Sequence, residues 1–128
     1  MMLVDTDIVI DYLRDVPEAV DFVEAQIDQI AISSITVAEL YQGVRDGAER
    51  DVLDVFLSGI SVLDTDLSIG RSAGLFRRQY KPSHSPGLAD CLIAATAVEH
   101  GIPLKTLNTK HFPMLKDVEA PYSKPGSR

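Results

Sequence analysis

Residues 3–13 read LVDTDIVIDYL and place acidic side chains directly after an apolar run. Residues 2–4 are typical of a short strand that is buried on both faces. Asp5 and Asp7 follow at once, although an unpaired charge is costly to bury. The stretch therefore predicts a strand whose end emerges from the core, with carboxylates at the point where it emerges.

Short apolar segments alternate with longer helical patterns along the rest of the chain. Apolar runs typical of strands are found at 2–4, 30–33, 60–63, 102–104 and 118–120. Helical spacing predicts helices at 8–14, 17–27, 34–46, 48–58, 64–80 and 88–100. This order is typical of an α/β domain, a short parallel sheet of four to five strands with helices on both faces. In such sheets ligands bind beyond the carboxyl ends of the strands, where Asp5 would lie.

Length and composition are typical of one globular domain. With 128 residues, 45% of them hydrophobic and 24% charged, the chain can bury a sizeable core without disulfides. The single cysteine, Cys91, excludes an intramolecular disulfide and is expected of a cytoplasmic protein. No apolar run reaches the roughly 20 residues of a membrane span, so we expect no membrane partner. We expect the domain to span residues 1–120 and residues 121–128 to form a flexible C-terminal tail.

The net charge of −7 is unevenly distributed along the chain. Residues 1–64 hold 14 acidic and 3 basic side chains, whereas residues 65–128 hold 5 acidic and 9 basic ones. A strongly acidic balance argues at first against a nucleic-acid partner. An acidic half and a basic half, however, fit a site with one part for cations and another for phosphates.

Three acidic residues stand at the starts or inner turns of separate predicted elements. Asp5 follows the first strand, Glu39 lies in the helix after the second strand, and Asp90 lies in the first turn of helix 88–100. Helix capping or a solvated position explains any one of them alone. Asp90 is the most informative, because the helix around it is almost entirely apolar or small and a buried charge needs a partner. Several carboxylates converging on one cation meet that need, and their hard oxygens suit Mg²⁺ or Mn²⁺.

One known family fits the opening stretch alone. LVDTDIVID resembles the first motif of the haloacid-dehalogenase-like phosphatases, in which one aspartate is a nucleophile and the next but one an acid/base. Asp5 and Asp7 have that spacing. Those phosphatases also need a separate lysine and a paired-acid motif after a later strand, and no such pair is visible in the sequence.

A broader resemblance covers residues 1–120 through three stretches, LVDTDIVIDYL, SSITVAELYQGV and GLADCLIAATAVEHGIPLKTLNTKHF. Together they resemble the PIN-domain nucleases, and within them the VapC-type toxins of bacterial and archaeal toxin–antitoxin pairs. The resemblance implies a PIN-like nuclease domain and places the family's acidic metal ligands, which carry its catalysis, on Asp5, Glu39 and Asp90. Thr6 matches the small hydroxyl residue beside the first acid.

One ligand position departs from the family's pattern. A fourth site, commonly an aspartate, falls on Asn108, which can coordinate through its amide oxygen or hold a water but brings no charge. The number of bound ions, one or two, therefore stays open, and a PIN-like module that binds metal or RNA without cleaving it stays an alternative. His111 is expected to pack or to face solvent rather than to replace the missing ligand.

The resemblance implies an endoribonuclease that uses Mg²⁺ or Mn²⁺ to hydrolyse RNA phosphodiester bonds. Basic residues of the second half are candidates for phosphate contacts, although a solvated helix face is an equal alternative for the first two: Arg77, Arg78, Lys81, Lys105 and Lys110. Cys91 is not expected to be a nucleophile, because an apolar helix raises the pKa of a thiol.

The resemblance also implies two protein partners. One is a second copy of the chain in a homodimer, and the other is a small cognate antitoxin that covers the acidic site. The apolar stripe Val52, Val55 and Phe56 is one candidate interface, although core packing explains it as well.

Overall fold

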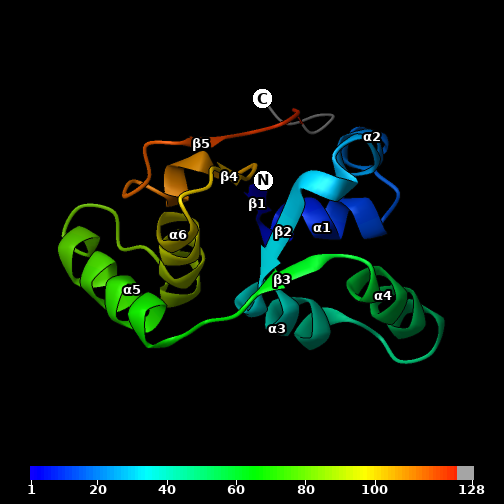
Figure 1. Cartoon of the computed structure of the whole chain (residues 1–128), viewed down its shortest axis with the longest axis horizontal. Helices are drawn as coiled ribbons and strands as arrows, with labels where there is room; N and C mark the ends of the chain where they lie inside the picture. Colours follow the sequence, from blue (N-terminus) through cyan, green and yellow to red (C-terminus); the bar gives the residue numbers. More distant parts are fainter. Residues whose placement is uncertain (124–128) are drawn as a thin grey trace.

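The computed structural model of the chain describes residues 1–123 and arranges its helices around one sheet (Figure 1). The strands are Met2–Val4 (β1), Ile30–Ser33 (β2), Ser61–Leu63 (β3), Leu104–Lys105 (β4) and Val118–Glu119 (β5). The α-helices are Thr6–Leu13 (α1), Pro17–Ala25 (α2), Ser34–Gly43 (α3), Ala48–Ser58 (α4), Leu67–Tyr80 (α5) and Leu88–His100 (α6). Two 3₁₀ turns are Ile27–Gln29 (η1) and Thr109–His111 (η2). Within the described residues, none of the helices is both long and apolar enough to span a bilayer.

The sheet is parallel throughout, in the order β3-β2-β1-β4-β5. β1 lies at its centre, where Leu3 is in register with Ala31 of β2 on one side and with Leu104 of β4 on the other. Because the strands are parallel, their carboxyl ends share one edge of the sheet. The predicted parallel sheet of four to five strands is confirmed.

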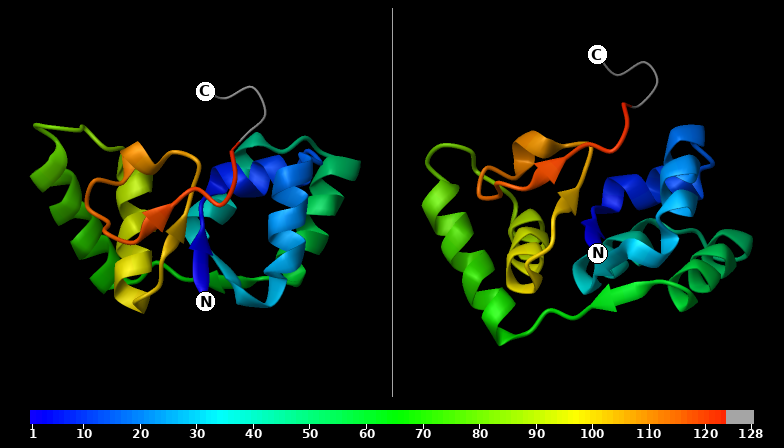
Figure 2. Two further views of the ribbon diagram at one scale, coloured as in Figure 1. Left: turned by 90° about the horizontal axis from the view of Figure 1, so that it is seen from above. Right: turned by 45° about the horizontal axis from the view of Figure 1, so that its top comes forward.

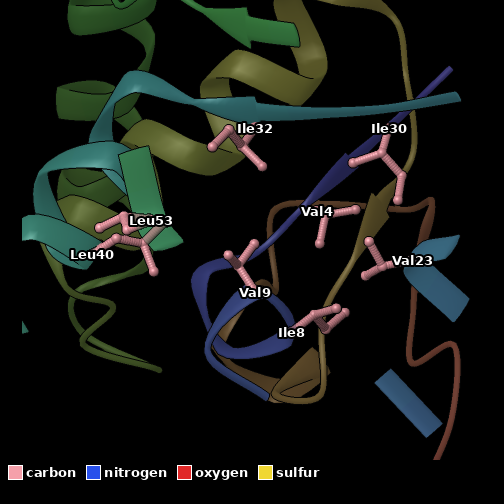
Figure 3. Close-up of a cluster of buried hydrophobic side chains, with 8 residues drawn as sticks. All are labelled: Val4, Ile8, Val9, Val23, Ile30, Ile32, Leu40 and Leu53. Carbon is pink, nitrogen blue, oxygen red and sulfur yellow. The ribbon is translucent and has the colours of Figure 1, made fainter. Parts of the chain in front are cut away.

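Alternate residues of the central strands face two different helix layers, as the two-residue period of a strand requires. Val4, Ile30 and Ile32 belong to one buried cluster with side chains from helices α1 to α4 (Figure 3). Leu3 and Ala31 face the opposite way and pack with α6. α5 packs in turn on α6, so the two layers lie on either side of the sheet (Figure 2). The predicted placement of helices on both faces is confirmed.

The first helix begins earlier than predicted. α1 starts at Thr6 instead of residue 8, because Asp5 is its N-cap and accepts a hydrogen bond from the Thr6 N–H at 2.8 Å. Asp7 lies inside the first turn. The strand therefore passes into the helix with no loop between them, and both acids are held rigidly at the sheet edge.

Two helix boundaries differ from the sequence prediction by three residues. α3 ends at Gly43 instead of just before Gly47, since the backbone of Val44 is already extended (ψ 144°). α5 begins at Leu67, because the carboxylate of Asp66 caps its first turn. Turn chemistry, which is less visible in a sequence than apolar periodicity, decided both positions.

The beginning of the expected C-terminal tail packs on the domain. The Tyr122 hydroxyl donates a 3.0 Å hydrogen bond to Asp11, and its ring contacts the buried cluster beside α1. Residues 124–128 of the predicted tail lie outside the described residues.

Candidate active site

The candidate site lies at the carboxyl edge of the sheet, between β1 and β4. The chain leaves β1 for α1 on one face and reaches β4 from α6 on the other, so the strand order reverses here. Such a reversal leaves a crevice beyond the strand ends. Asp5 directly follows β1 and Thr106 directly follows β4, so residues 101 positions apart meet at the same point.

Asp5 is held from two sides and is only 7% exposed. One carboxylate oxygen accepts the Thr6 N–H, and the other accepts the hydroxyl of Thr106, both at 2.8 Å. Burial, reinforced by the nearby carboxylate of Asp7, raises the pKa of Asp5 to about 7, although both hydrogen bonds oppose the rise. A carboxylate in these surroundings is stabilised in its charged form by a neighbouring cation.

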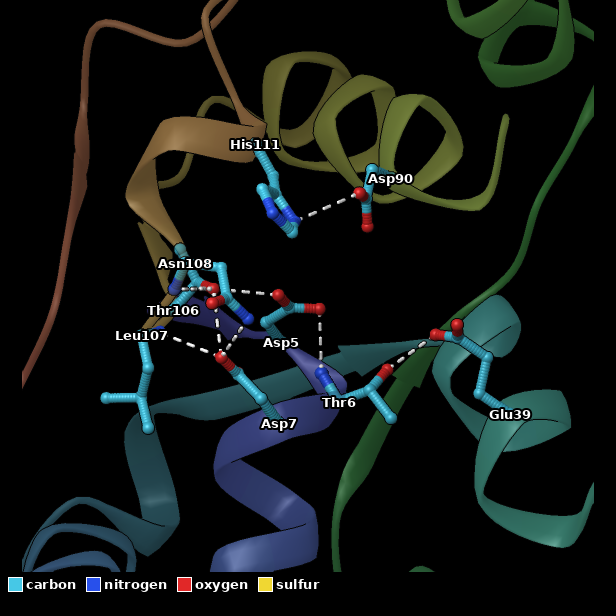
Figure 4. Close-up of polar contacts among 9 residues, drawn as sticks. All are labelled: Asp5, Thr6, Asp7, Glu39, Asp90, Thr106, Leu107, Asn108 and His111. Carbon is cyan, nitrogen blue, oxygen red and sulfur yellow. Dashed lines mark hydrogen bonds and ion pairs between the residues drawn. The ribbon is translucent and has the colours of Figure 1, made fainter. Parts of the chain in front are cut away.

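Thr6 links Asp5 to the second acidic residue. Its hydroxyl donates to Glu39 Oε1 at 2.7 Å and lies 2.9 Å from the hydroxyl of Thr36, which is fully buried. Glu39 itself is half-buried on α3 (Figure 4). The bond fixes one oxygen of Glu39, which suits the supporting role expected of Thr6.

Asp90 reaches the crevice from the first turn of α6, and its side chain is 30% exposed. Burial raises its pKa; the ring of His111 lowers it, and the carboxylates of Glu39 and Asp7 raise it further. His111 Nδ1 lies 3.6 Å from Asp90 Oδ2. The prediction for His111 was therefore incomplete: the ring is largely exposed to solvent, as expected, but it also contacts a candidate ligand.

Asp7 ties α1 to the loop that follows β4. Its Oδ2 accepts the Leu107 N–H at 2.9 Å and the Asn108 side-chain amide at 3.1 Å. The Thr106 hydroxyl, which donates mainly to Asp5, lies 3.3 Å from the same oxygen. Asn108 lies at the crevice, but it faces Asp7 with its nitrogen. The fourth predicted ligand position is thus linked to Asp7 and, through Thr106, to Asp5 in one hydrogen-bonded network (Figure 4).

Asp5, Glu39 and Asp90 surround one space, although they come from three separate elements (Figure 4). Within residues 1–123, no three His, Cys, Asp or Glu side chains lie close enough together to hold an ion in this conformation. Direct ligation by all three would therefore require their side chains to move. The donor set itself, carboxylate oxygens with an amide oxygen nearby, fits Mg²⁺ or Mn²⁺.

The five basic residues expected near phosphate have different environments. Arg77, Arg78 and Lys81 are exposed at the end of α5, and Lys110 is exposed in η2 beside Asn108. Lys105 differs, since its side chain is only 14% exposed and its ammonium is paired with Glu119. We therefore remove Lys105 from the candidates for phosphate contacts.

Cys91 is fully buried in α6, and burial raises the pKa of its thiol. A thiol in these surroundings stays protonated at neutral pH and cannot attack a phosphate. The sequence-based exclusion of Cys91 as a nucleophile agrees with this geometry.

Three members of the network were missed or misjudged in the sequence: Thr106, Asp7 as a link to the loop, and His111. Thr106 carries a signal that was available, because it follows the fourth strand as Asp5 follows the first. The other two contacts depend on how a loop closes over α1 and α6, which no local pattern reports.

Comparison with known proteins is consistent with this geometry. A family model described as the PIN domain matches residues 2–116. The chain belongs to the PIN-domain family. Ribonuclease VapC10 of Mycobacterium tuberculosis is 42% identical to this PIN-domain chain over 131 residues, covering 100% of the chain and 98% of the relative. Ribonuclease VapC19 of the same organism is 38% identical over 127 residues, covering 95% of this chain and 100% of the relative.

Solved structures have the same PIN-domain fold. A toxin–antitoxin complex from Klebsiella pneumoniae contains a chain with a TM-score of 0.83 and 32% identity, covering 96% of this chain and 99% of that one. The structure of VapBC2 from Rickettsia felis bound to a DNA fragment from its promoter contains a chain with a TM-score of 0.77 and 26% identity. The match covers 93% of this chain and 96% of that one. The matches span the whole PIN domain, whereas the phosphatase resemblance was limited to its first motif.

Proposed function

We propose that this PIN-domain protein is a divalent-metal-dependent endoribonuclease and the toxin of a toxin–antitoxin pair. One observation carries the proposal: three carboxylates from separate elements face one space at the carboxyl edge of the sheet, where the strand order reverses between β1 and β4. It is supported by full-length similarity to proteins named as VapC ribonucleases. The proposal also explains why Asp5 and Asp90 are held in surroundings that raise their pKa values.

In this proposal Asp5, Glu39 and Asp90 hold Mg²⁺ or Mn²⁺, with the amide oxygen of Asn108 assisting directly or through water. When bound, such an ion supplies charge neutralisation at the phosphodiester and makes a water molecule more acidic. Asp5 is the most rigidly held of these side chains, because Thr6 and Thr106 fix both of its oxygens.

The remaining chemistry belongs to the protein's own side chains. Glu39 or Asp90 accepts the proton of the attacking water, since both are partly exposed while Asp5 is buried. Thr6 keeps Glu39 oriented during this transfer. Attack by water leaves a 5′-phosphate and a 3′-hydroxyl, whereas attack by the ribose 2′-hydroxyl would leave a cyclic phosphate.

The direct test is cleavage of an RNA pool by the purified protein, with Mg²⁺, Mn²⁺ or EDTA present, followed by analysis of both product ends. We expect metal-dependent cleavage, 5′-phosphate ends, and at least a hundredfold loss in Asp90→Asn, an effect typical of lost catalytic groups. Asp28→Asn, an exposed acid at the opposite edge of the sheet, is the matched control. Cyclic phosphate ends or EDTA-resistant cleavage would contradict the mechanism. Mn²⁺ binding without cleavage of any RNA would instead identify the non-cleaving module.

The RNA backbone is proposed to lie on the exposed basic residues beside the crevice: Arg77, Arg78, Lys81 and Lys110. A bound cation neutralises the acidic cluster, so a chain of net charge −7 can still approach a polyanion from this side. RNA choice would then follow from the shape of this surface rather than from the catalytic carboxylates.

The proposed antitoxin site adjoins Glu39. A groove of about 460 Å³ between α1, α3 and α4 is lined by Glu39, by three further charged residues and by apolar side chains that include Leu13, Leu40, Val44 and Val52. An antitoxin segment seated there would reach the catalytic acids, where a basic side chain could pair with them. The solved complexes that resemble this chain contain antitoxins, which supports a partner of this kind.

The proposed homodimer is a separate question, tested by light scattering of the purified chain. The predicted stripe does not form one surface, because Val52 and Val55 are 57% and 72% exposed. Phe56, by contrast, packs against the ring of Tyr12 with centroids 5.4 Å apart. Only the two valines are therefore available to a partner.

A further inference from the structure

We propose that Asp7 is a positioning residue that orients Asn108 and holds the loop 106–108 against the first helix. The inference rests on the proposed function only for its consequence, that Asn108 presents an oxygen to the metal. The arrangement itself is a property of the protein without any ion.

The hydrogen bonds of Asp7 tie it to two parts of the chain, as a supporting residue requires. Oδ2 accepts from Leu107 N and Asn108 Nδ2, and Oδ1 accepts the Ile8 N–H at 2.8 Å. The Thr106 hydroxyl lies 3.3 Å from Oδ2, but it donates mainly to Asp5 at 2.8 Å. A carboxylate oxygen offers about two lone pairs, so Oδ2 is fully engaged, while Oδ1 is held by the Ile8 N–H. Ligation by Asp7 would break bonds that connect two separate parts of the chain.

The same contacts determine which way the Asn108 amide faces. The Asp7 oxygen already accepts a backbone N–H from Leu107, so it is an acceptor at this point. Only the NH₂ group of Asn108 can satisfy an acceptor, which turns its carbonyl oxygen away from Asp7. Within residues 1–123 that oxygen has no hydrogen-bond partner, so it is free to contact a ligand in the crevice.

An asparagine is therefore the residue that suits Asp7 at this position. A carboxylate at residue 108 would face Asp7 across 3.1 Å with no hydrogen to share, and the two charges would repel. The loop that Asp7 holds also carries His111, through the turn η2, toward Asp90. Asp7 thus sets the geometry of one whole side of the site.

The first test measures amide hydrogen exchange in the loop, in EDTA and without substrate. Asp7→Ala should speed exchange of the Leu107 N–H about tenfold, the effect of one lost hydrogen bond. Asp7→Asn should change it less than about threefold, because its amide oxygen can still accept the bonds from Leu107 and Asn108. Asp28→Asn, which removes an exposed charge at the opposite sheet edge, should leave the loop unchanged.

The second test measures Mn²⁺ affinity by calorimetry. Asp7→Ala should weaken binding about tenfold or more, as removal of a residue that orients a ligand does, and Asp7→Asn less than about threefold. In an Asn108→Ala background, Asp7→Ala should add less than about twofold, because the residue it orients is absent. Equal losses in Asp7→Asn and Asp7→Ala would overturn the proposal in favour of a simple charge effect. An undiminished effect in the Asn108→Ala background would overturn it as well.

A third test changes Asn108, the donor of the hydrogen bond to Asp7, and remains informative if Asp7→Ala does not fold. At pH 8, Asn108→Asp should speed exchange of the loop more than Asn108→Ala, because repulsion is worse than a missing bond. Equal exchange in both variants would contradict the proposed contact. If the wild-type protein neither binds Mn²⁺ nor cleaves RNA, the proposed function fails, while the exchange experiments still decide the role of Asp7.

Discussion

Asp5 is buried, caps a helix and lies beside other carboxylates, and these circumstances act on its ionisation in opposite directions. The Thr6 and Thr106 hydrogen bonds favour the charged form, while burial and Asp7 favour the neutral one. Burial dominates, so the pKa is raised to about 7. At the scale of one residue, the fold therefore holds the Asp5 carboxylate in surroundings where only a neighbouring cation fully stabilises its charged form.

This conflict predicts how stability depends on pH without metal. Because the pKa of Asp5 is raised from 3.8 to about 7, the folded state binds a proton that the unfolded state has released, and the free energy of unfolding should fall as pH rises from about 4 to about 7. Asp5→Asn has no carboxylate to ionise at this position, so it should not lose this stability as the pH rises. At pH 8 its free energy of unfolding should exceed that of the wild type by up to about 4 kcal/mol. Urea denaturation in EDTA at several pH values measures the difference.

The matching control is Asp28→Asn, which changes the same group at an exposed position. Its stability should follow the wild-type curve across the whole pH range. A wild-type protein as stable as Asp5→Asn at pH 8 would show that Asp5 is not strained by its surroundings.

At the scale of single elements, α6 shows how a helix end is fixed by one residue. Gly101 follows the helix with φ 62°, a left-handed conformation that glycine adopts without cost. Nothing lies within 4 Å of a Cβ built there, so only backbone strain opposes a side chain. Gly101→Ala should lower the free energy of unfolding by about 1 kcal/mol, measured by urea denaturation.

Gly74 provides the opposite case and serves as the control. It lies inside α5, is exposed, and a Cβ there would also meet nothing within 4 Å. Gly74→Ala should therefore raise the free energy of unfolding, by about 0.5–1 kcal/mol. Changes of the same sign in the two variants would contradict the explanation from backbone conformation.

The groove beside α4 leads to a prediction for antitoxin binding. Val52 lines it and is 57% exposed, so an aspartate there should fold normally but place an unpaired charge against an apolar partner. We expect Val52→Asp to weaken binding of the cognate antitoxin at least tenfold, about 1.4 kcal/mol, in a calorimetric titration. Val98→Asp, 53% exposed on α6, is the control and should bind normally. Equal affinities for the two variants would place the partner elsewhere.

At the scale of the whole molecule, the topology separates the charges. The acidic first half of the chain forms β1 to β3 and helices α1 to α4, and the more basic second half forms α5, α6 and the strands β4 and β5. The crevice lies where the two halves meet, between β1 and β4. A polyanion can therefore approach from the second half while a cation is held mainly by the first.

Salt dependence tests this arrangement. Arg78→Gln should weaken RNA binding and reduce the slope of log affinity against log salt concentration by about 1, the effect of one lost phosphate contact. Arg50→Gln removes a similarly exposed charge from α4, in the acidic half, where the guanidinium is paired with Asp46. It should leave the slope unchanged. Filter binding at several salt concentrations, in a protein inactivated by Asp90→Asn, measures both, and equal slopes for the two variants would contradict the proposed RNA path.

The sequence by itself determined the elements of this protein and three of its candidate acids. Apolar runs and helical spacing predicted every strand and α-helix, because burial acts on each short segment in a way that its own composition records. Asp5, Glu39 and Asp90 could be singled out because each stands at the start or inner turn of an element, and Asp90 also interrupts a nearly apolar helix.

Only the tertiary structure decided how these residues act together. Thr106 reaches Asp5, and Asp7 reaches Asn108, across about a hundred positions of sequence, and His111 meets Asp90 only because η2 closes over α6. The ion pair of Lys105 with Glu119 likewise exists only once β4 and β5 are neighbours. Hydrogen bonds and ion pairs act over a few ångströms in space, so their partners are set by topology and not by local composition.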